Sequence, residues 1–553
     1  MEADLSIEIV VERLASSRLV RDYHAGDPVL SSFFTGGPWD PAAYERKSLE
    51  VAGRFDAGRR RAMAEAIRPA SARAEQRLSE VVEGDGFFVT TGQQAGFLTG
   101  PLYTVHKLLS AVRLADQLER VLDRPVAPLF WVASEDHDWE EASLATIIDA
   151  GNQLHHLRLP GPNGSTTLPM SRRILGNDVA DLIRELGPLL PPTEFSEDLI
   201  DVIARCYAPG RSVAEAFEDM IVDLFAEFDI LVVDAGHPAL KALSGDVLAR
   251  ELERSAEHEA LIAEHTERLV AAGYDPQVQV IPDATNAFFE DEAGRQRLLR
   301  DGDRFVLRGS GRTFSTDEAM ELLRREPDRF SPNVFLRPVV ESTVFPTLAY
   351  VAGPAELAYF AQIGCLFKAH EIEMPIVYPR ASVTIVERKV RKVLDKYHLD
   401  LPSMRVPPHE LASKVVRDQL PDSVEQALST IAARIEAGYR DLLAAAVQID
   451  PTLKGPVNRA QNVSIRQLRD VEAKIVQLAK KQQEIQLEQL SKAGVNLYPE
   501  GAPQERVLNI VPYLARYGRG LLGDIAASIE IELTASLPAW SGVRCGDFRA
   551  TPA

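Results

Sequence analysis

The chain has 553 residues, of which 45% are hydrophobic and 26% are charged. This composition is typical of a globular protein with ample apolar material for a core, and the length predicts more than one domain. The formal net charge of -20 repels nucleic-acid backbones and anionic membranes, so we expect no nucleic acid and no membrane as a partner. A local basic pocket for a small anion stays compatible with this charge.

Cysteine usage and the start of the chain both favour the cytoplasm. Cys206, Cys365 and Cys545 are far apart and form no CxxC pair, which predicts a reducing compartment without disulfides or a cysteine zinc site. The first ten residues are acidic and carry no basic residue, so they do not resemble a secretory signal. The most apolar stretch, residues 344–366, is interrupted by proline, glycine and glutamate, and so predicts no membrane span.

The first 80 residues are polar and predict helices, and the first α/β signal follows them. Residues 87–90 predict a short strand, and a glycine-containing loop spans residues 92–100. Pro101 is then expected in the first turn of a helix that ends at Asp123–Pro125. Residues 126–133 predict a second strand, in which Pro128 indicates an edge position or an irregular start. This order has the length of a right-handed βαβ crossover.

Further strands and a helical region follow along the chain. Residues 151–225, with a loop at 161–164, are interpreted as an insertion between core strands, and residues 230–233, 376–378 and 383–386 predict strands. We therefore expect a core domain over residues 1–385 and a helical region over 386–553, with one helix ending near Asp450–Pro451. A heptad seam predicts a coiled coil over about residues 464–492, formed either within the chain or between two chains; its positions are Leu468, Val471, Ile475, Leu478, Gln482 and Ile485.

The glycine-containing segment, residues 90–107, is the first candidate binding site. It follows a predicted strand and enters a helix, where backbone N–H groups and the positive helix end face a ligand crevice in open α/β sheets. It has neither the Walker A ending nor a GxGxxG pattern. The alternative is a tight turn with a surface His–Lys pair. The candidates for catalysis are His106 and Lys107, and those for binding are Thr91, Gly92, Gln93, Gln94, Thr99, Gly100 and Tyr103.

The acidic segment, residues 131–141, follows the second predicted strand and so falls at the same sheet edge. Glu135, Asp136 and Asp138 are candidates for holding Mg²⁺ or a substrate ammonium, and His137 is a candidate general base. The alternative is a helix start, in which Ser134 is the N-cap and the acidic side chains oppose the helix dipole.

Two later segments carry single candidate groups. Gly353–Pro354 starts a helix with Glu356 in its first turn, where the carboxylate could bind an amine or a hydroxyl, with Gly353 and Tyr359 beside it. The alternative is a helix-terminal charge next to a core tyrosine. Arg380 lies between two predicted strands and could clamp a carboxylate or phosphate, or be an exposed turn residue.

Taken together, these segments resemble the bacillithiol biosynthesis cysteine-adding enzymes over about residues 85–520. The matching strings are TTGQQAGFLTGPLYTVHK, WVASEDHDWEE, LRPVVESTVFPTLAYVAGPAELAYF, MPIVYPRASVTIVE and PQERVLNIVPYLARYG. The resemblance implies an α/β fold with a Rossmann-like core, related to class I aminoacyl-tRNA synthetases and nucleotidyltransferases. It also implies inserted segments, a C-terminal coiled coil that forms homodimers, and addition of cysteine to glucosaminyl-malate. Glu341–Ser342 departs from the glutamine usual in the family, and residues 234–238 also diverge.

Joining a carboxylate to an amine in water is uphill, so the expected amide-forming ligase needs an activator. ATP is the expected cosubstrate, with Mg²⁺ possible, and whether AMP or ADP is released stays open. The expected roles are phosphoryl charge stabilisation by His106 and Lys107, amine or sugar contact by Glu356, and malate contact by Arg380. Two alternatives remain: a nucleotide-binding coiled-coil scaffold without turnover, and a nucleotidyltransferase acting on another small amine.

Overall fold

The computed structural model describes residues 7–13, 16–161, 167–418, 421–482 and 484–534. The chain divides into two compact units, which we call the core unit (Ile9–Thr384 and Glu505 onward) and the helical unit (Ile385–Gln504 with the first residues). Cys545 and most of the loop expected at residues 161–164 lie outside the described residues. The sequence analysis expected a single boundary at 385/386. The observed division differs, because the chain after residue 504 belongs to the core unit.

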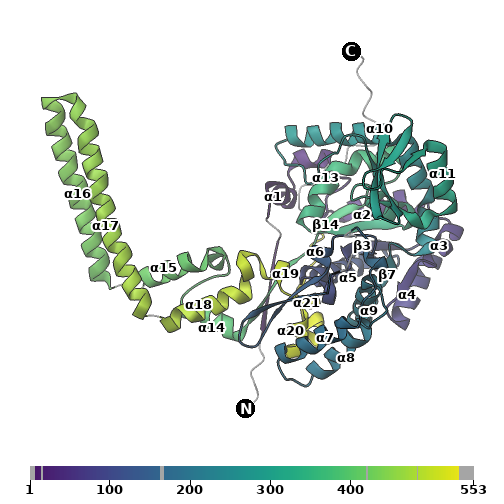
Figure 1. Cartoon of the computed structure of the whole chain (residues 1–553), viewed down its shortest axis with the longest axis horizontal. Helices are drawn as coiled ribbons and strands as arrows, with labels where there is room; N and C mark the ends of the chain where they lie inside the picture. The colour runs from purple at the N-terminus through teal and green to yellow at the C-terminus, as the bar shows by residue number, and fades with distance from the viewer. Residues whose placement is uncertain (1–6, 14–15, 162–166, 419–420, 483, 535–553) are drawn as a thin grey trace. The chain divides into compact units, whose positions relative to one another are not determined.

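The core unit is built on a six-stranded sheet with the order β14-β13-β3-β4-β7-β2 (Figure 1). The first five of these strands run parallel to their neighbours, and β2 alone is antiparallel. The chain builds β3, β4 and β7 outward in one direction, and then returns to place β13 and β14 on the other side of β3. This is a Rossmann strand order, and it confirms the predicted fold. The strands are β2 (Ile67–Pro69), β3 (Phe87–Gln94), β4 (Val126–Ala133), β7 (Leu231–Asp234), β13 (Thr347–Ala352) and β14 (Ile376–Pro379).

Helices cover both faces of this sheet, which explains its nearly continuous apolar strands. Phe88 and its neighbours on one face belong to the larger apolar cluster, and Phe87 and Val89 on the other face belong to a smaller one. The first face carries α1 (Arg18–Ala25), α4 (Ala72–Glu83), α10 (Pro238–Ala271), α12 (Arg337–Val344) and α13 (Pro354–Ala369). The second face carries α2 (Pro41–Ala52) and α5 (Tyr103–Leu122).

Two long segments interrupt the order of the core strands. The first lies between β4 and β7 and includes the region expected to be inserted; its elements are α6 (Trp139–Ala142), β5 (Leu144–Ile148), β6 (Leu154–Arg158), α7 (Asp178–Leu186), α8 (Ser196–Cys206) and α9 (Val213–Leu224). The second follows α10 and forms a five-stranded antiparallel sheet that the sequence analysis missed. Its elements are β8 (Ala284–Asp291), β9 (Gly294–Asp301), β10 (Arg304–Leu307), β11 (Thr313–Ser315), α11 (Thr316–Arg325) and β12 (Phe330–Pro332).

The expectation about Pro101 is wrong, whereas the irregular strand start expected at Pro128 is confirmed. Pro101 precedes the first turn of α5, whose N-cap is Leu102, and it forms a bridge with Asn509 of the C-terminal segment. Pro128 lies in β4, which is a central strand between β3 and β7. It is tolerated there because pairing with β7 begins only at Leu129, so no strand lies beside Pro128 on that side.

The helical unit contains a long hairpin of α16 (Asp422–Ile449) and α17 (Lys454–Gln482), which lie side by side (Figure 1). The predicted helix end is confirmed, since Asp450 is the C-cap of α16. Of the seam residues, Leu468 and Ile475 are half-buried, whereas Val471 and Leu478 are 51% and 65% exposed. The helices thus pair within the chain, and dimerisation through them stays a prediction. The side chains of Gln482 and Ile485 lie outside the described residues. The other helices are α14 (Arg388–Lys396), α15 (Pro408–Asp418) and α18 (Glu484–Leu497).

The chain returns to the core unit after residue 504. Three short helices follow, and two of them pack on elements of the core unit, α20 on α8 and α21 on α5. These helices are α19 (Gln504–Val507), α20 (Val511–Tyr517) and α21 (Gly520–Ser528). Over the described part of the chain, every helix is too short or too polar to cross a bilayer.

Candidate functional site

A cavity of 580 Å³, here called the main cavity, follows the carboxyl edge of the parallel sheet. Its walls come from the ends of β3, β4, β7 and β13 and from the residue after β14. The strand order reverses between β3 and β13, and ligands of open α/β sheets bind at such a reversal. Candidate residues from four distant segments meet here, namely Gly92, Gln93, Gln94, Tyr103, Lys107, Glu135, Asp136, Gly353, Glu356, Tyr359 and Arg380.

The remaining candidates lie outside the wall of the main cavity. The Thr91 hydroxyl donates to the Val351 carbonyl at 2.9 Å and so joins β3 to β13. Thr99 and Gly100 lie in the loop before α5. His106 lies in α5 and is fully buried. His137 is half-buried beside Arg295, at 3.4 Å. Asp138 is the N-cap of α6 and accepts from the Glu141 N–H at 3.3 Å.

The loop between β3 and α5 is held in an uncommon backbone conformation. Leu98 and Thr99 have φ values of 53° and 75°, which side-chain-bearing residues rarely adopt. The Asn509 amide donates to the carbonyls of Leu98 and Gly100 at 2.7 Å each, and the Tyr207 hydroxyl accepts from the Leu98 N–H at 2.9 Å. The geometry of the glycine-containing loop therefore depends on side chains distant in sequence.

Lys107 and Glu356 form an ion pair at the strand reversal, with 2.8 Å between the ammonium and the carboxylate. The ammonium also donates to the Gly92 carbonyl and to the Gln93 side chain. Glu356 accepts from the Tyr350 hydroxyl at 2.6 Å and from the Gly353 N–H at 2.7 Å. Lys107 is 2% exposed, so the alternative of a surface His–Lys pair is wrong.

Burial and pairing act in opposite directions on these two groups. Burial alone would raise the pKa of Glu356, but Lys107 and the two hydrogen bonds outweigh it and lower that pKa below its ordinary value. Burial lowers the pKa of Lys107, and Glu356 only partly compensates. The carboxylate is thus held ionised by an ammonium that has lost much of its hydration.

Glu505 joins Arg380 and His106 in a second buried network behind the main cavity. Arg380 donates two hydrogen bonds of 2.7 Å to the Glu505 carboxylate, and the His106 Nδ1 lies 3.2 Å from it. Burial would raise the pKa of Glu505, but Arg380 and His106 lower it well below the ordinary carboxyl range. Arg380 is neither an exposed turn residue nor an unpaired clamp, since it is 2% exposed and its fork is filled.

The acidic segment is largely committed to contacts within the protein. Glu135 pairs with Lys241 of α10, and Asp136 accepts from the Gln94 amide at 2.5 Å and from the His137 N–H at 2.6 Å. Ser134 is not the N-cap expected from the sequence, because its hydroxyl donates to Asp234 and Asp138 caps α6 instead. Burial raises the pKa of Glu141, which accepts a 3.2 Å hydrogen bond from Tyr103.

Four arginines of the main cavity were missed by the sequence analysis: Arg295, Arg297, Arg337 and Arg506. Arg295 and Arg297 lie over the Phe288 ring, at 3.9 and 4.9 Å from its centre, and pair with no carboxylate of the described residues. Burial lowers the pKa of Arg295 to about 10. The sequence signal that could have found them is the alternation of side chains along β9, which puts Arg295 and Arg297 on one face of the strand. Arg506 lies in the late motif that carried the family resemblance.

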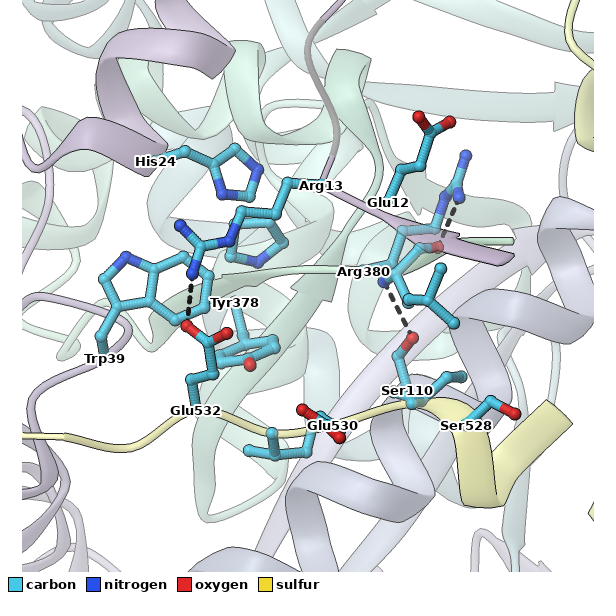
Figure 2. A pocket seen from close by; sticks show the side chains of 15 residues that line it. Glu12, Arg13, His24, Trp39, Ser110, Tyr378, Arg380, Ser528, Glu530 and Glu532 are labelled. Carbon is cyan, nitrogen blue, oxygen red and sulfur yellow. Dashed lines mark hydrogen bonds and ion pairs between the residues drawn. The ribbon is translucent and has the colours of Figure 1, made fainter. Parts of the chain in front are cut away.

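A smaller cavity of 320 Å³, here called the side cavity, is also lined by Arg380 (Figure 2). Figure 2 shows Arg13 beside Glu532 and Trp39, with Glu530 nearby. The wall facing Arg380 includes Ser110, whose hydroxyl accepts from the Ala381 N–H at 3.1 Å. The main cavity is the larger of the two and holds the sheet-edge groups, so we assign the candidate active site to it.

The buried pair predicts a strong coupling between Lys107 and Glu356. Lys107→Met leaves a buried carboxylate without its cation, and we expect a loss of about 3 kcal/mol in the free energy of unfolding. The double variant Lys107→Met/Glu356→Gln should recover part of that loss. Urea unfolding of the four proteins measures the coupling. The same cycle on the exposed pair Arg254–Glu257 serves as control and should give a coupling close to zero, because solvent screens exposed pairs. Additive losses at Lys107 and Glu356 would contradict the coupling of the buried pair.

The Glu505 network predicts a pH-dependent stability. Glu505→Gln leaves Arg380 unpaired, and we expect a loss of about 3 kcal/mol at pH 7. The pKa of Glu505 is lower in the folded than in the unfolded protein, so its stabilisation is present above the ordinary pKa of 4.5 and is lost as pH falls below it. The difference in the free energy of unfolding between wild type and Glu505→Gln should therefore become smaller below that pH. Glu83→Gln, an exposed change of the same charge, is the control, and a gap that stays constant in acid would contradict the account.

Comparison with known proteins agrees with the Rossmann-like core and the helical region over almost the whole chain. Residues 6–381 match the model of the N-terminal Rossmann-like domain of bacillithiol biosynthesis BshC, and residues 383–533 match the model of its C-terminal coiled-coil domain. A protein of Salinibacter ruber named "Putative cysteine ligase BshC" is 33% identical over 84% of each chain. One of the same name from Symbiobacterium thermophilum is 31% identical over 89% of this chain and 91% of its own. The chain therefore belongs to the bacillithiol biosynthesis BshC family.

Proposed function

We propose that the protein is an amide-forming ligase that joins the carboxyl group of cysteine to the amine of glucosaminyl-malate, with activation of the carboxyl group by ATP. The names of the relatives support a cysteine ligase. The observation that carries the proposal is the main cavity at the strand reversal, where cationic and acidic side chains line one space. That space has room and charge for an amine, a dicarboxylate and a phosphate group.

The carboxylates of the malate moiety need cationic side chains that are not already paired with a carboxylate of the protein. Arg380 was expected to fill this role, but its guanidinium is bound to Glu505. Arg295 and Arg297 have no carboxylate partner among the residues described, and both face the cavity. Guanidinium groups bind carboxylates with paired, charge-assisted hydrogen bonds. We therefore assign the malate carboxylates to these two arginines.

The attacking amine has to lose a proton before it can form the amide bond. Glu141 lines the main cavity, and its raised pKa makes it a suitable acceptor for that proton. Asp136 is close by in the same wall and contributes negative charge that attracts an ammonium. Glu135 is a weaker candidate because it pairs with Lys241, and Asp138 lies outside the wall. His137 keeps a supporting position beside Asp136.

Cysteine carboxylate attacks a phosphorus atom of ATP in the proposed activation step. The products are an acyl phosphate with ADP, or an acyl adenylate with pyrophosphate, and the amine then displaces phosphate or AMP. The ammonium of Lys107 reaches from α5 to the end of β3, where it can stabilise negative charge on the transferred group. His106 cannot touch that group, since it is fully buried against Glu505. It acts as a positioning residue through Glu505 and Arg380.

Magnesium would accompany the nucleotide. No three ligating side chains of the described residues converge at this cavity. One or two carboxylates together with nucleotide phosphates are the usual protein contribution to Mg²⁺ binding. Asp136 and Glu141 fit that smaller requirement, and the ion would neutralise phosphate charge there.

The direct experiment is incubation of the full chain with cysteine, ATP, Mg²⁺ and glucosaminyl-malate, followed by mass spectrometry. We expect a product with the mass of both substrates less water, formed only when all components are present, together with ADP or AMP. Tight nucleotide binding without any cysteine-dependent product would favour the scaffold. Turnover of ATP with other amines but not with glucosaminyl-malate would favour a nucleotidyltransferase of different specificity.

The assignment of the malate end predicts a selective effect of Arg297→Gln. Loss of a charge-assisted hydrogen bond of about 1.5–3 kcal/mol should raise KM for glucosaminyl-malate about 10- to 100-fold. KM for cysteine should change little. Steady-state kinetics with each substrate varied in turn makes the measurement. Arg312→Gln is the matched control, because Arg312 follows β10 and does not line the cavity. An unchanged acceptor KM in Arg297→Gln would remove Arg297 from the malate site.

A further inference from the structure

Three ligating side chains form a buried cluster away from both cavities. Glu251 and His258 belong to α10, and His370 is the C-cap residue of α13. Glu251 and His258 are 0% exposed and His370 is 5% exposed. One oxygen or nitrogen atom from each lies within 4.8 Å of the others. None of the three lines the main cavity or the side cavity.

Hydrogen bonding fixes one imidazole ring of the cluster and leaves one nitrogen of each ring without a partner in the described structure. Glu251 accepts from the Asn286 N–H at 2.8 Å with one oxygen, and its other oxygen lies 2.6 Å from the His258 Nδ1. An ionised carboxylate only accepts, so the His258 Nδ1 is the donor of this bond, and Nε2 is the ring nitrogen left for another partner. The Nε2 atoms of His258 and His370 are both buried without a hydrogen-bond partner in the described structure.

Buried polar atoms without partners are rare in folded proteins, because each forfeits its hydration. Two of them occur here in rings whose centres are 4.7 Å apart. The arrangement resembles a carboxylate–histidine pair of a metal site, in which the carboxylate fixes the ring that binds the ion.

We propose that Glu251, His258 and His370 bind one divalent transition-metal ion, of which Zn²⁺ is the best fit. Neutral imidazole nitrogens and a carboxylate oxygen are ordinary zinc ligands, and imidazole suits first-row transition ions rather than Mg²⁺ or Ca²⁺. Glu251 completes the site as a ligand or as the hydrogen-bond partner of His258. The site is closed to substrates because all three side chains are buried, so its role is structural.

The position of the proposed ion in the fold indicates which helices it would connect. Helix α10 departs from helical geometry at Arg254, between Glu251 and His258, where its φ is -117°. An ion here ties this interrupted helix to the end of α13, the helix that begins at Pro354 and carries Glu356. Binding to the folded chain alone stabilises it according to the concentration of the ion. The proposal is independent of the proposed ligase activity, and either can fail without the other.

The test uses the full chain, stripped with a chelator and dialysed against Zn²⁺ in thiol-free buffer. Elemental analysis should find one zinc ion per wild-type chain, and none in His258→Gln or His370→Gln. His155→Gln is the matched control, because it removes a partly exposed histidine that lies 2.9 Å from Asp149. It should keep the zinc. Zn²⁺ should raise the Tm of wild type and of the control only. A metal-free wild type, or His258→Gln and His370→Gln proteins that keep the zinc, would overturn the proposal.

X-ray absorption at the zinc edge of the wild-type protein covers the case in which the variants fail to fold. We expect nitrogen ligands at about 2.0 Å with the scattering pattern of two imidazoles. No histidine lines the main cavity among the residues that the structure describes. Zinc bound there would show oxygen ligands without imidazole, and that spectrum would overturn the proposal.

Discussion

The ion pair between Lys107 and Glu356 is the interaction on which the rest of the site depends. The two side chains come from the helices that follow β3 and β13, the neighbouring strands between which the strand order reverses. The ammonium also binds the carbonyl of Gly92, so it connects the end of β3 directly to the start of α13. Gly92 has to be glycine for this approach, because a Cβ there would lie 2.9 Å from the Trp131 carbonyl of β4. Three adjacent strand ends are thereby held in one fixed arrangement around the cavity.

The C-terminal segment after residue 504 supports that arrangement from behind. Glu505 neutralises Arg380 and holds His106, while Asn509 fixes the left-handed turn at Leu98 and Thr99. This explains why a motif so late in the chain accompanies the glycine-containing loop. The same segment contributes Arg506 to the cavity wall. The candidate active site is therefore incomplete without residues that lie more than 100 positions after the last strand of the parallel sheet.

Strands β3, β4, β7 and β14 could be predicted because each has a strong local pattern, and the meeting of four segments could be predicted because carboxyl ends of parallel strands share an edge. The strand order and strand β13 were not predicted. Pairing partners could not be predicted in the same way. Nothing near Arg380 in sequence indicates that Glu505 will fill its guanidinium, and nothing near His106 indicates that this residue turns away from the cavity. Arg295 and Arg297 lie in a strand of alternating polar residues that lacks an apolar run, so the five-stranded sheet was missed with them. Ser134 and Asp138 are equally good N-caps locally, and the bond from Ser134 to Asp234 decides between them.

The central claim is that the main cavity binds the acceptor with its carboxylates on β9 and its amine toward α6. A crystal structure of the full chain with glucosaminyl-malate tests this most directly. The account predicts malate oxygens within hydrogen-bonding distance of Arg295 or Arg297, and the sugar amine near Glu141. An acceptor bound in the side cavity, or bound in the main cavity with its malate against Glu141, would contradict it.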